Sequence, residues 1–178
     1  MVGARAISFR PLTRGDLPRL VEWIARPHVA EWWNEPVGAA GVEATYGPCV
    51  DGTDPTLAFV IQLDDRPVGF IQCYRLDDEP DYEQAVRVDS AAGVDLFVGE
   101  ADVMGGGFGS TVLARFVDTV VWPRYPDLGR CMAGPSVRNG RSQRAFEKAG
   151  FRRVRVAEVA GEPDPEQVMV LERPLTRP

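Results

Sequence analysis

Alternating hydrophobic and polar residues near the start of the chain predict a strand followed by a helix. In residues 4–12, Ile7 and Phe9 fall on one side of the expected strand. Thr13 and Asp16 resemble a helix cap, in which an acid three residues later bonds back to the capping residue. The helix that follows carries its apolar residues at helical spacing: Leu17, Leu20, Val21 and Ile24.

Prolines and a glycine turn delimit the helices expected in the first third of the chain. Pro27 should end the first helix, because a proline ring disfavours helix in the residue before it. A second, short helix is expected over residues 41–50, between Pro36 and the turn formed by Asp51 and Gly52.

Two β-rich runs in the middle of the chain predict an antiparallel hairpin. They cover residues 57–63 and 67–74 and are separated by Asp64, Asp65 and Arg66. A polar segment over residues 76–92 follows, and we expect it to be a mobile or ligand-gating loop. The alternative is a solvated acidic loop. Its acids are Asp77, Asp78, Glu79, Asp81, Glu83 and Asp89.

A third hydrophobic run is followed by a glycine-rich turn and then by a helix. Residues 93–98 read as a central strand, and the helix begins at about Phe108 and should end at Pro123. The turn between them holds four glycines within five residues, namely Gly105, Gly106, Gly107 and Gly109. The expected apolar face of the helix is Val112, Leu113, Phe116, Val117, Val120 and Val121.

The last third of the chain predicts a strand, a helix and a closing strand pair. The strand covers 130–133, the helix 142–149 before Gly150, and the pair 151–160 and 167–171. Strand pairs interleaved with helices indicate an α+β fold, with a mixed, mostly antiparallel sheet of six to seven strands flanked by helices.

Composition narrows the class of protein. The 178 residues, 44% of them hydrophobic, can bury one core, so we expect a single domain over 1–178. The net charge of −6 and pI near 4.9 leave no basic surface for nucleic acid, and would suit a cationic small molecule. No segment suits a signal peptide or a membrane span, so a cytoplasmic protein is expected.

The cysteines and the single histidine give no metal pattern. Cys49, Cys73 and Cys131 are widely separated and read as reduced packing residues, and His28 has no cluster of partners at metal-ligand spacing. We therefore expect no metal site.

The glycine turn suggests a cradle for a pyrophosphate. Glycines allow positive φ and close approach of the backbone to a ligand, and the following helix presents unpaired N–H groups to an anion. A mobile loop is the alternative interpretation. No Lys-Ser or Lys-Thr pair follows the last glycine, and no dinucleotide fingerprint is evident, which leaves acetyl-CoA as the expected cofactor.

A second motif, residues 139–151, reads NGRSQRAFEKAGF and closes on a strand. Together with the glycine turn it resembles the GCN5-related N-acetyltransferase (GNAT) superfamily, whose fold has a splayed central strand pair. Residues 28–33, 66–74 and 93–95 look like the aminoglycoside 6'-N-acetyltransferases. Kasugamycin 2'-N-acetyltransferases and siderophore-lysine acylating relatives share parts of this pattern.

The resemblance implies which residues hold acetyl-CoA and the amine. Cofactor-binding residues would be Phe97, Val98, Met104, Gly105, Gly106, Gly107, Phe108, Gly109, Ser110, Asn139, Ser142 and Phe146. Asp95 matches the aspartate beside the reacting amine, where it would position the ammonium group and accept a proton. A strand aspartate paired with a core arginine is the structural alternative.

An acid beside two tryptophans suits a polyamine sugar, because an aromatic ring can pack on a sugar face or attract an ammonium group. The implied substrate-binding residues are Glu31, Trp32, Trp33, Tyr46, Tyr74, Asp77, Asp78 and Asp95. One tryptophan is expected to serve only as core, and Tyr46 and Tyr74 are equally explained by packing. His28 is expected to be structural, with a general base as its alternative role.

Three positions depart from the family pattern. Met104 stands where relatives carry Arg or Gln, and Phe146 where many offer a tyrosine to the thiolate, so protonation would fall to water or Ser142. Gly134 stands where the 6' enzymes carry an acid before Pro-Ser, so a partner for a substrate ammonium group is missing there.

The resulting expectation is a cytoplasmic, acetyl-CoA-dependent aminoglycoside N-acetyltransferase acting at a 6' or 2' amine and conferring resistance. A smaller aminoglycoside such as kasugamycin is one candidate. The alternatives are acylation of a hydroxylysine-type siderophore precursor and a non-catalytic acetyl-CoA sensor. Monomer and homodimer both stay open.

Overall fold

The computed structural model describes residues 6–175, and its seven strands form one mixed sheet in the order β1-β2-β3-β4-β5-β7-β6. The pairs β1·β2, β5·β7 and β6·β7 are antiparallel, whereas β4·β5 is parallel, which confirms the predicted fold class. The strands are β1 (Ile7–Pro11), β2 (Leu57–Leu63), β3 (Arg66–Arg75), β4 (Ala91–Val98), β5 (Arg130–Ala133), β6 (Arg152–Ala157) and β7 (Glu166–Glu172).

The helices connect these strands much as the hydrophobic spacing predicts. Positions 4 and 5 of the first expected strand lie outside the described residues. The α-helices are α1 (Leu17–Ile24), α2 (Pro27–Ala30), α3 (Gly38–Asp51), α4 (Pro80–Val86), α5 (Phe108–Phe116), α6 (Trp122–Arg124) and α7 (Gly140–Lys148). Short 3-10 turns cover Arg14–Asp16, Leu76–Asp78 and Ala101–Val103.

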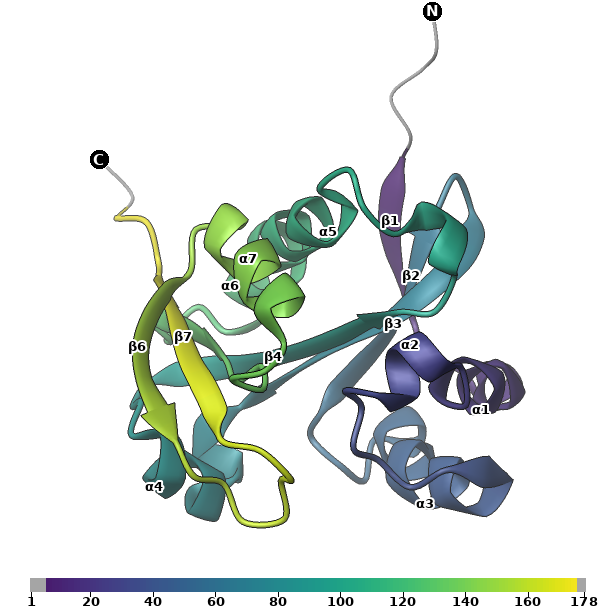
Figure 1. Ribbon diagram of the computed structural model, residues 1–178, viewed down its shortest axis with the longest axis horizontal. Coiled ribbons are helices and arrows are strands. Elements are labelled where there is room, and N and C mark those ends of the chain that lie inside the picture. The colour runs from purple at the N-terminus through teal and green to yellow at the C-terminus, as the bar shows by residue number, and fades with distance from the viewer. Residues whose placement is uncertain (1–5, 176–178) are drawn as a thin grey trace, which may run out of the picture. The chain divides into compact units, whose positions relative to one another are not determined.

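The chain divides into two compact units. Unit 1 runs up to Gln72 and adds Leu96–Gly106, and unit 2 comprises Cys73–Asp95 and the residues from Gly107 onward. In unit 1, α1 and α3 lie side by side (Figure 1) and bury a core that includes Leu20, Ile24 and an aromatic group. That aromatic group is Trp23, Tyr46, Phe70 and Phe97.

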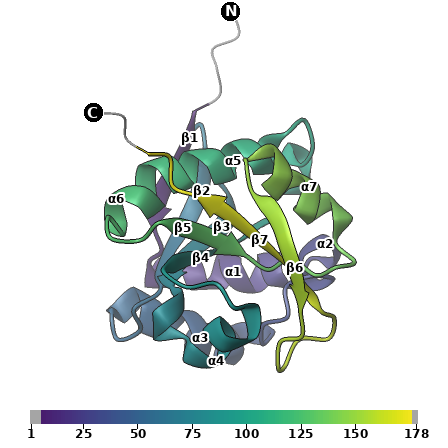
Figure 2. The same ribbon diagram turned by 90° about the vertical axis from the view of Figure 1, so that its left-hand side faces the viewer.

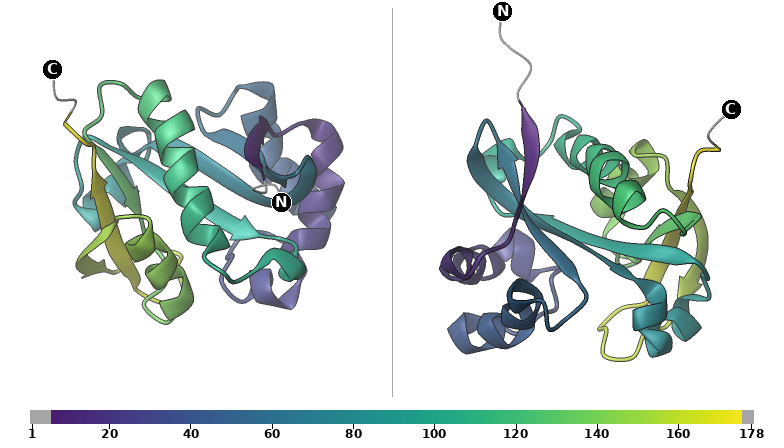
Figure 3. Two further views of the ribbon diagram at one scale, coloured as in Figure 1. Left: turned by 90° about the horizontal axis from the view of Figure 1, so that it is seen from above. Right: turned by 180° about the vertical axis from the view of Figure 1, so that it is seen from behind.

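In unit 2, helices cover both faces of the strands. Figures 2 and 3 show α5 and α7 next to each other on one face, while α4 lies on the other. The core beneath α4 joins Leu76 and Val86 to Met132, Val168 and Val170 from the strands. Amphipathic helices on a sheet bury their apolar stripes in this way.

The hairpin turn has the geometry that its sequence predicts. Asp64 and Asp65 take φ values of 50° and 63°, the left-handed pair of a two-residue type I′ turn. Aspartate tolerates this region better than most residues. The turn thus sets the register in which β3 follows β2.

One expectation about the middle of the chain is wrong, and another holds to within one residue. Residues 76–92 are not a loop, because α4 starts at Pro80 and buries Val86. The helix after the glycines continues through a π-helical turn, Val117–Val121, into α6 and ends one residue after Pro123. The wider π turn accommodates the proline and rotates Val120 to a half-buried position.

The capping box at the start of the first helical segment is confirmed. The Thr13 amide and hydroxyl both donate to Oδ2 of Asp16, at 2.9 and 2.6 Å, and Arg10 donates to both Asp16 oxygens at 2.8 Å. These bonds, with that from Arg10 the largest cause, lower the pKa of Asp16 from 3.8 to about 2.

Asp16→Asn is therefore expected to lower the free energy of unfolding by about 1–2 kcal/mol at neutral pH. The folded pKa lies below the unfolded value, so this stabilisation is present above about pH 4 and is lost as the pH falls through about 2. Urea unfolding at a series of pH values should show wild type and variant converging in acid. A difference that does not depend on pH would contradict the assignment.

Candidate functional site

The glycine turn has a backbone that only glycine adopts easily. Gly105, Gly106 and Gly107 take φ values of 99°, 56° and 83°, and no protein atom lies within 4 Å of where a Cβ of Gly105 or Gly106 would stand. The glycines are thus required by backbone conformation, and not by packing against other protein atoms. Three consecutive left-handed residues form a concave backbone of the kind that binds anions.

Helix α5 starts directly from this turn, with Gly107 as its N-terminal cap. The Gly107 carbonyl accepts from the Ser110 hydroxyl at 2.8 Å and from the Thr111 hydroxyl at 3.0 Å. The first amides of the helix have no partner within it, so they and the positive helix end are available to an anion. The arrangement fits a pyrophosphate held by backbone groups. The Met104 side chain is uncharged and cannot form an ion pair with a phosphate, so only backbone groups are offered at this position as well.

The second motif forms the start of α7. Asn139 caps the helix, because its Oδ1 accepts from the Ser142 amide at 3.0 Å. Helix α7 packs on α5, where a Cβ at Gly109 would stand 3.7 Å from that of Ala145. Phe146 is buried and packs edge-on against Phe151. In this structure Asn139 and Phe146 thus shape the helix and the core, and their contact with a cofactor stays a prediction.

The end of β4 is anchored in unit 1 by side chains from α1, from α2 and from Arg26 between them. His28 donates from Nε2 to the Val98 carbonyl at 3.0 Å, and Arg26 donates to the Gly99 carbonyl at 2.7 Å. Trp23 donates to Glu100 at 2.8 Å. Because a carbonyl only accepts, the His28 proton sits on Nε2, which agrees with the structural role expected for this residue.

The structure distinguishes the two tryptophans. Trp33 donates to the Tyr46 hydroxyl at 2.9 Å and packs edge-on against Phe70 and Phe97. Trp32 is 36% exposed. Trp33 is therefore the tryptophan that belongs to the core, and Trp32, beside exposed Glu31, is the one whose ring is accessible to a ligand. Tyr46, 1% exposed, is a packing residue, which agrees with the alternative interpretation.

Asp95 lies in unit 2 next to a half-buried tyrosine, Tyr74. Tyr74 hydrogen-bonds to the Asp95 carboxylate, and burial together with this negative charge raises the pKa of Tyr74 well above its usual value. The Tyr74 ring lies against Gly93, where a Cβ would overlap the ring. Gly93 and Tyr74 thus fix the position of Asp95 on the strand.

Glu166, at the start of β7, is a buried acid that feels the charge of Asp95 and that the sequence pattern does not single out. It is 9% exposed, and the Tyr82 hydroxyl donates to its Oε2 at 2.7 Å. Burial, followed by the negative charge of Asp95, raises the pKa of Glu166 to about 7 against the opposing effect of Tyr82. Asp95, Glu166, Tyr74 and Tyr82 therefore form one coupled polar group, which we call the carboxylate cluster.

The acids of the polar segment are placed differently. Asp77 forms an ion pair with Arg75, which also binds Asp127, so the Asp77 carboxylate is already partnered. Asp78 is exposed. Of these two, only Asp78 stands outside the ion pairs formed within residues 6–175, and the role of both in binding substrate stays a prediction.

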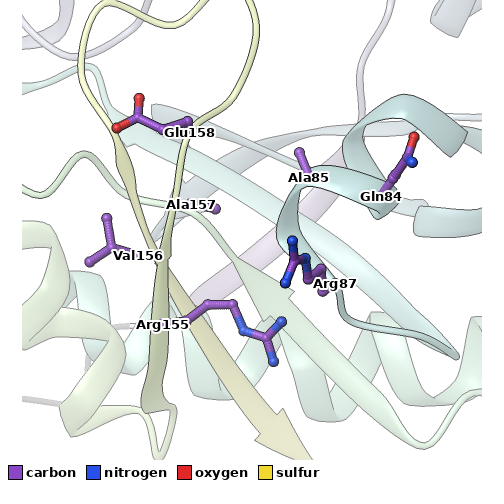
Figure 4. A pocket seen from close by; sticks show the side chains of 7 residues that line it. All are labelled: Gln84, Ala85, Arg87, Arg155, Val156, Ala157 and Glu158. Atoms are coloured by element: carbon purple, nitrogen blue, oxygen red, sulfur yellow. The ribbon is translucent and has the colours of Figure 1, made fainter.

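Other features of the described residues add little to the site. Figure 4 shows a shallow hollow of about 360 Å³ between α4 and β6, lined by Gln84, Ala85, Arg87, Arg155, Val156, Ala157 and Glu158, none of them a predicted site residue. All three cysteines are free, and Cys73 and Cys131 are buried. Within residues 6–175, no group of His, Cys, Asp or Glu could hold a metal ion, and no helix is long and apolar enough to span a membrane.

Comparisons with known proteins agree with these features. The family model described as acetyltransferase (GNAT) domain matches residues 13–159. An aminoglycoside N(6')-acetyltransferase type 1 of Klebsiella pneumoniae is 28% identical over 152 residues, covering 83% of this chain and 75% of that protein. The crystal structure of aminoglycoside acetyltransferase AAC(6')-Ib with coenzyme A has a TM-score of 0.83 at 28% identity, covering 94% and 95% of the two chains. The same enzyme with coenzyme A and kanamycin gives 0.83 at 29% identity, with the same coverage.

Proposed function

Because the chain belongs to the GNAT acetyltransferase family, we propose that it transfers an acetyl group from acetyl-CoA to an amine of an aminoglycoside antibiotic. The observation that carries the proposal is the carboxylate cluster. Its two acids, Asp95 and Glu166, would neutralise the ammonium groups of a polycationic sugar. The relatives named as aminoglycoside acetyltransferases support the same substrate class. We further propose one acetyltransferase domain over 1–178, acting in the cytoplasm.

The glycine turn and the start of α5 are the groups that would hold acetyl-CoA, which supplies the activated acetyl group as a thioester. The left-handed glycines and the free amides of α5 bind the pyrophosphate through backbone N–H groups. By the resemblance, Phe97 and Val98 lie at the thioester, where a backbone N–H polarises the carbonyl. Because the Met104 side chain is uncharged, the backbone bears this binding alone.

Asp95 acts on the amine. A protonated amine cannot attack the thioester carbonyl. The Asp95 carboxylate therefore positions the ammonium group and accepts a proton from it, directly or through water. Its usual pKa is too low for an ideal base, and orientation of the reactants therefore contributes much of the rate. Phe146 cannot donate a proton, which leaves water or Ser142 to protonate the departing thiolate.

Acetylation removes a positive charge and hydrogen-bond donors from the sugar. Since cationic groups give RNA ligands much of their affinity for phosphates, the product would bind ribosomal RNA less tightly, and resistance follows. The 6' amine is favoured by the named relatives, and the 2' amine of kasugamycin is the second candidate.

Thiol release from acetyl-CoA across kasugamycin, kanamycin, tobramycin, gentamicin and hydroxylysine tests the substrate class. We expect turnover with at least one aminoglycoside and none with hydroxylysine. Activity on hydroxylysine alone would move the protein to siderophore synthesis. Binding of acetyl-CoA without turnover on any amine would instead support a sensor.

The two tryptophans offer a matched pair of variants. Trp32→Ala should raise the KM for the aminoglycoside by about 3- to 30-fold, the range expected for a lost cation–π or sugar-stacking contact, and should leave stability within about 0.5 kcal/mol. Trp33→Ala should cost about 3–5 kcal/mol of stability, because it removes a ring packed on Phe70 and Phe97. Kinetics and urea unfolding of both variants check the assignment, and a substrate KM unchanged in Trp32→Ala would refute it.

A further inference from the structure

Gly134 and Glu166 share one space in unit 2. Gly134 follows β5, and Glu166 begins β7. The two segments are fixed to each other, since the Gln167 amide donates to the Pro135 carbonyl at 2.8 Å and Ser136 bridges to Glu166. A Cβ at Gly134 would overlap Oε2 of Glu166 and stand 2.7 Å from the Tyr82 hydroxyl. The carboxylate therefore occupies the place that a side chain at position 134 would take.

The charge of this carboxylate has no cationic partner in the described part of the chain. The ion pairs that the structure forms between residues 6 and 175 do not include Glu166, whose side chain accepts from the neutral Tyr82 hydroxyl. A buried acid without a counter-charge is costly to ionise, and the raised pKa of Glu166 reflects this cost. An ammonium group entering beside it would remove the cost.

Position 134, directly before Pro135, carries no acid, and the carboxylate of Glu166 from another strand fills the space beside it. We propose that Glu166 is a substrate-binding carboxylate that holds an ammonium group of the aminoglycoside near the one at Asp95, and that Gly134 is required to make room for it. The inference rests on the proposed function and specifies its substrate: the acceptor carries at least two amines, one of which reacts while another is bound by Glu166.

Glu166→Gln tests the role with little change of shape, because the amide oxygen still accepts from Tyr82. We expect the KM for kanamycin, or for the best aminoglycoside of the panel, to rise by about 10- to 100-fold, as for truncation of one partner of a buried charge pair. The KM for acetyl-CoA should stay within about twofold of wild type, because the glycine turn is untouched. Glu162→Gln is the matched control, since Glu162 is an exposed acid on the same connection and should change neither constant by more than about twofold.

A proton balance separates this role from a structural one. Near pH 7 Glu166 is partly protonated, and a bound ammonium group favours the ionised form, so binding should release protons. Calorimetry in two buffers of different ionisation enthalpy, with coenzyme A present, should show more proton release for wild type than for Glu166→Gln. Equal proton release, or an unchanged aminoglycoside KM in a folded Glu166→Gln protein, would overturn the inference.

A swap of positions tests the shared space. Glu166→Ala should lose affinity for the aminoglycoside, and adding Gly134→Asp should restore at least about tenfold of it, because the new carboxylate enters the vacated space. A folded double variant no better than Glu166→Ala would overturn the shared position. If the wild-type protein is inactive on every aminoglycoside, the proposed function itself is rejected. If the wild type is active and Glu166→Gln leaves the aminoglycoside KM unchanged, only the role of Glu166 is rejected.

Discussion

Replacing Asp95 by asparagine is expected to lower kcat for acetyl transfer by a factor of about 10²–10⁴, the range that proton transfer by a positioned side chain contributes. Asparagine keeps the shape and can still bond to Tyr74, but it cannot accept a proton or neutralise an ammonium group. The affinity for acetyl-CoA should persist, because the glycine turn does not use this carboxylate. Steady-state kinetics with acetyl-CoA and an aminoglycoside varied separately measure both constants.

A surface aspartate provides the control for this substitution. Asp118 is exposed on the π-helical turn, and Asp118→Asn should leave kcat within about twofold of wild type. Thermal unfolding of both variants shows whether the fold is intact. A folded Asp95→Asn protein with wild-type kcat would remove Asp95 from the mechanism and favour its structural alternative.

Gly106→Val is expected to raise the KM for acetyl-CoA by about 10- to 100-fold, with the aminoglycoside KM much less affected. At a φ of 56° a side chain costs about 1–2 kcal/mol, and a β-branched one costs more. The loop must then distort, and the new side chain occupies open space on the side where a pyrophosphate would approach. Titration of the variant with coenzyme A measures the loss without relying on turnover.

Gly52 is a matched control for backbone strain. It caps α3 at a φ of 73° and, like Gly106, has no atom within 4 Å of a built Cβ. Gly52→Val should therefore cost stability by the same mechanism while leaving coenzyme A binding unchanged. If the two variants bind coenzyme A equally well, the glycine turn is not the pyrophosphate site.

Local signals in the sequence predict most of the elements, because each depends on neighbouring residues. The capping pair Thr13 and Asp16, the turn at Asp64 and Asp65, and the start of α5 at Phe108 all follow from residue types at short spacing. The order of strands and helices then restricts the fold to a mixed sheet covered by helices.

The sequence pattern does not predict helix α4, because acidic residues recur along the whole of residues 76–92. The expected loop over 76–92 overlooks that Pro80 is a good first residue for a helix and that Tyr82 and Val86 are four residues apart. These two apolar positions and Leu76 were enough to bury one side of the segment. In residues 76–92 the high content of acids therefore hides the short helical spacing of Tyr82 and Val86.

Glu166 could not be found from spacing, because its contact with position 134 depends on how β5 and β7 pair. The signal available was indirect: by the resemblance, Gly134 stands where the 6' enzymes carry an acid before Pro-Ser, and Glu166 is an acid at the start of the last strand. Likewise, adjacent Trp32 and Trp33 are equivalent by sequence, and only the packing of Trp33 on Phe70 and Phe97 distinguishes them.

Mass spectrometry of the products formed from acetyl-CoA and kanamycin, with coenzyme A quantified in the same reaction, tests the central claim most directly. Direct transfer predicts one N-acetylated aminoglycoside for each coenzyme A released, with the acetyl group on a single amine. Release of coenzyme A together with an equal amount of free acetate, or an aminoglycoside pool left unmodified across kanamycin, tobramycin, gentamicin and kasugamycin, would contradict the account.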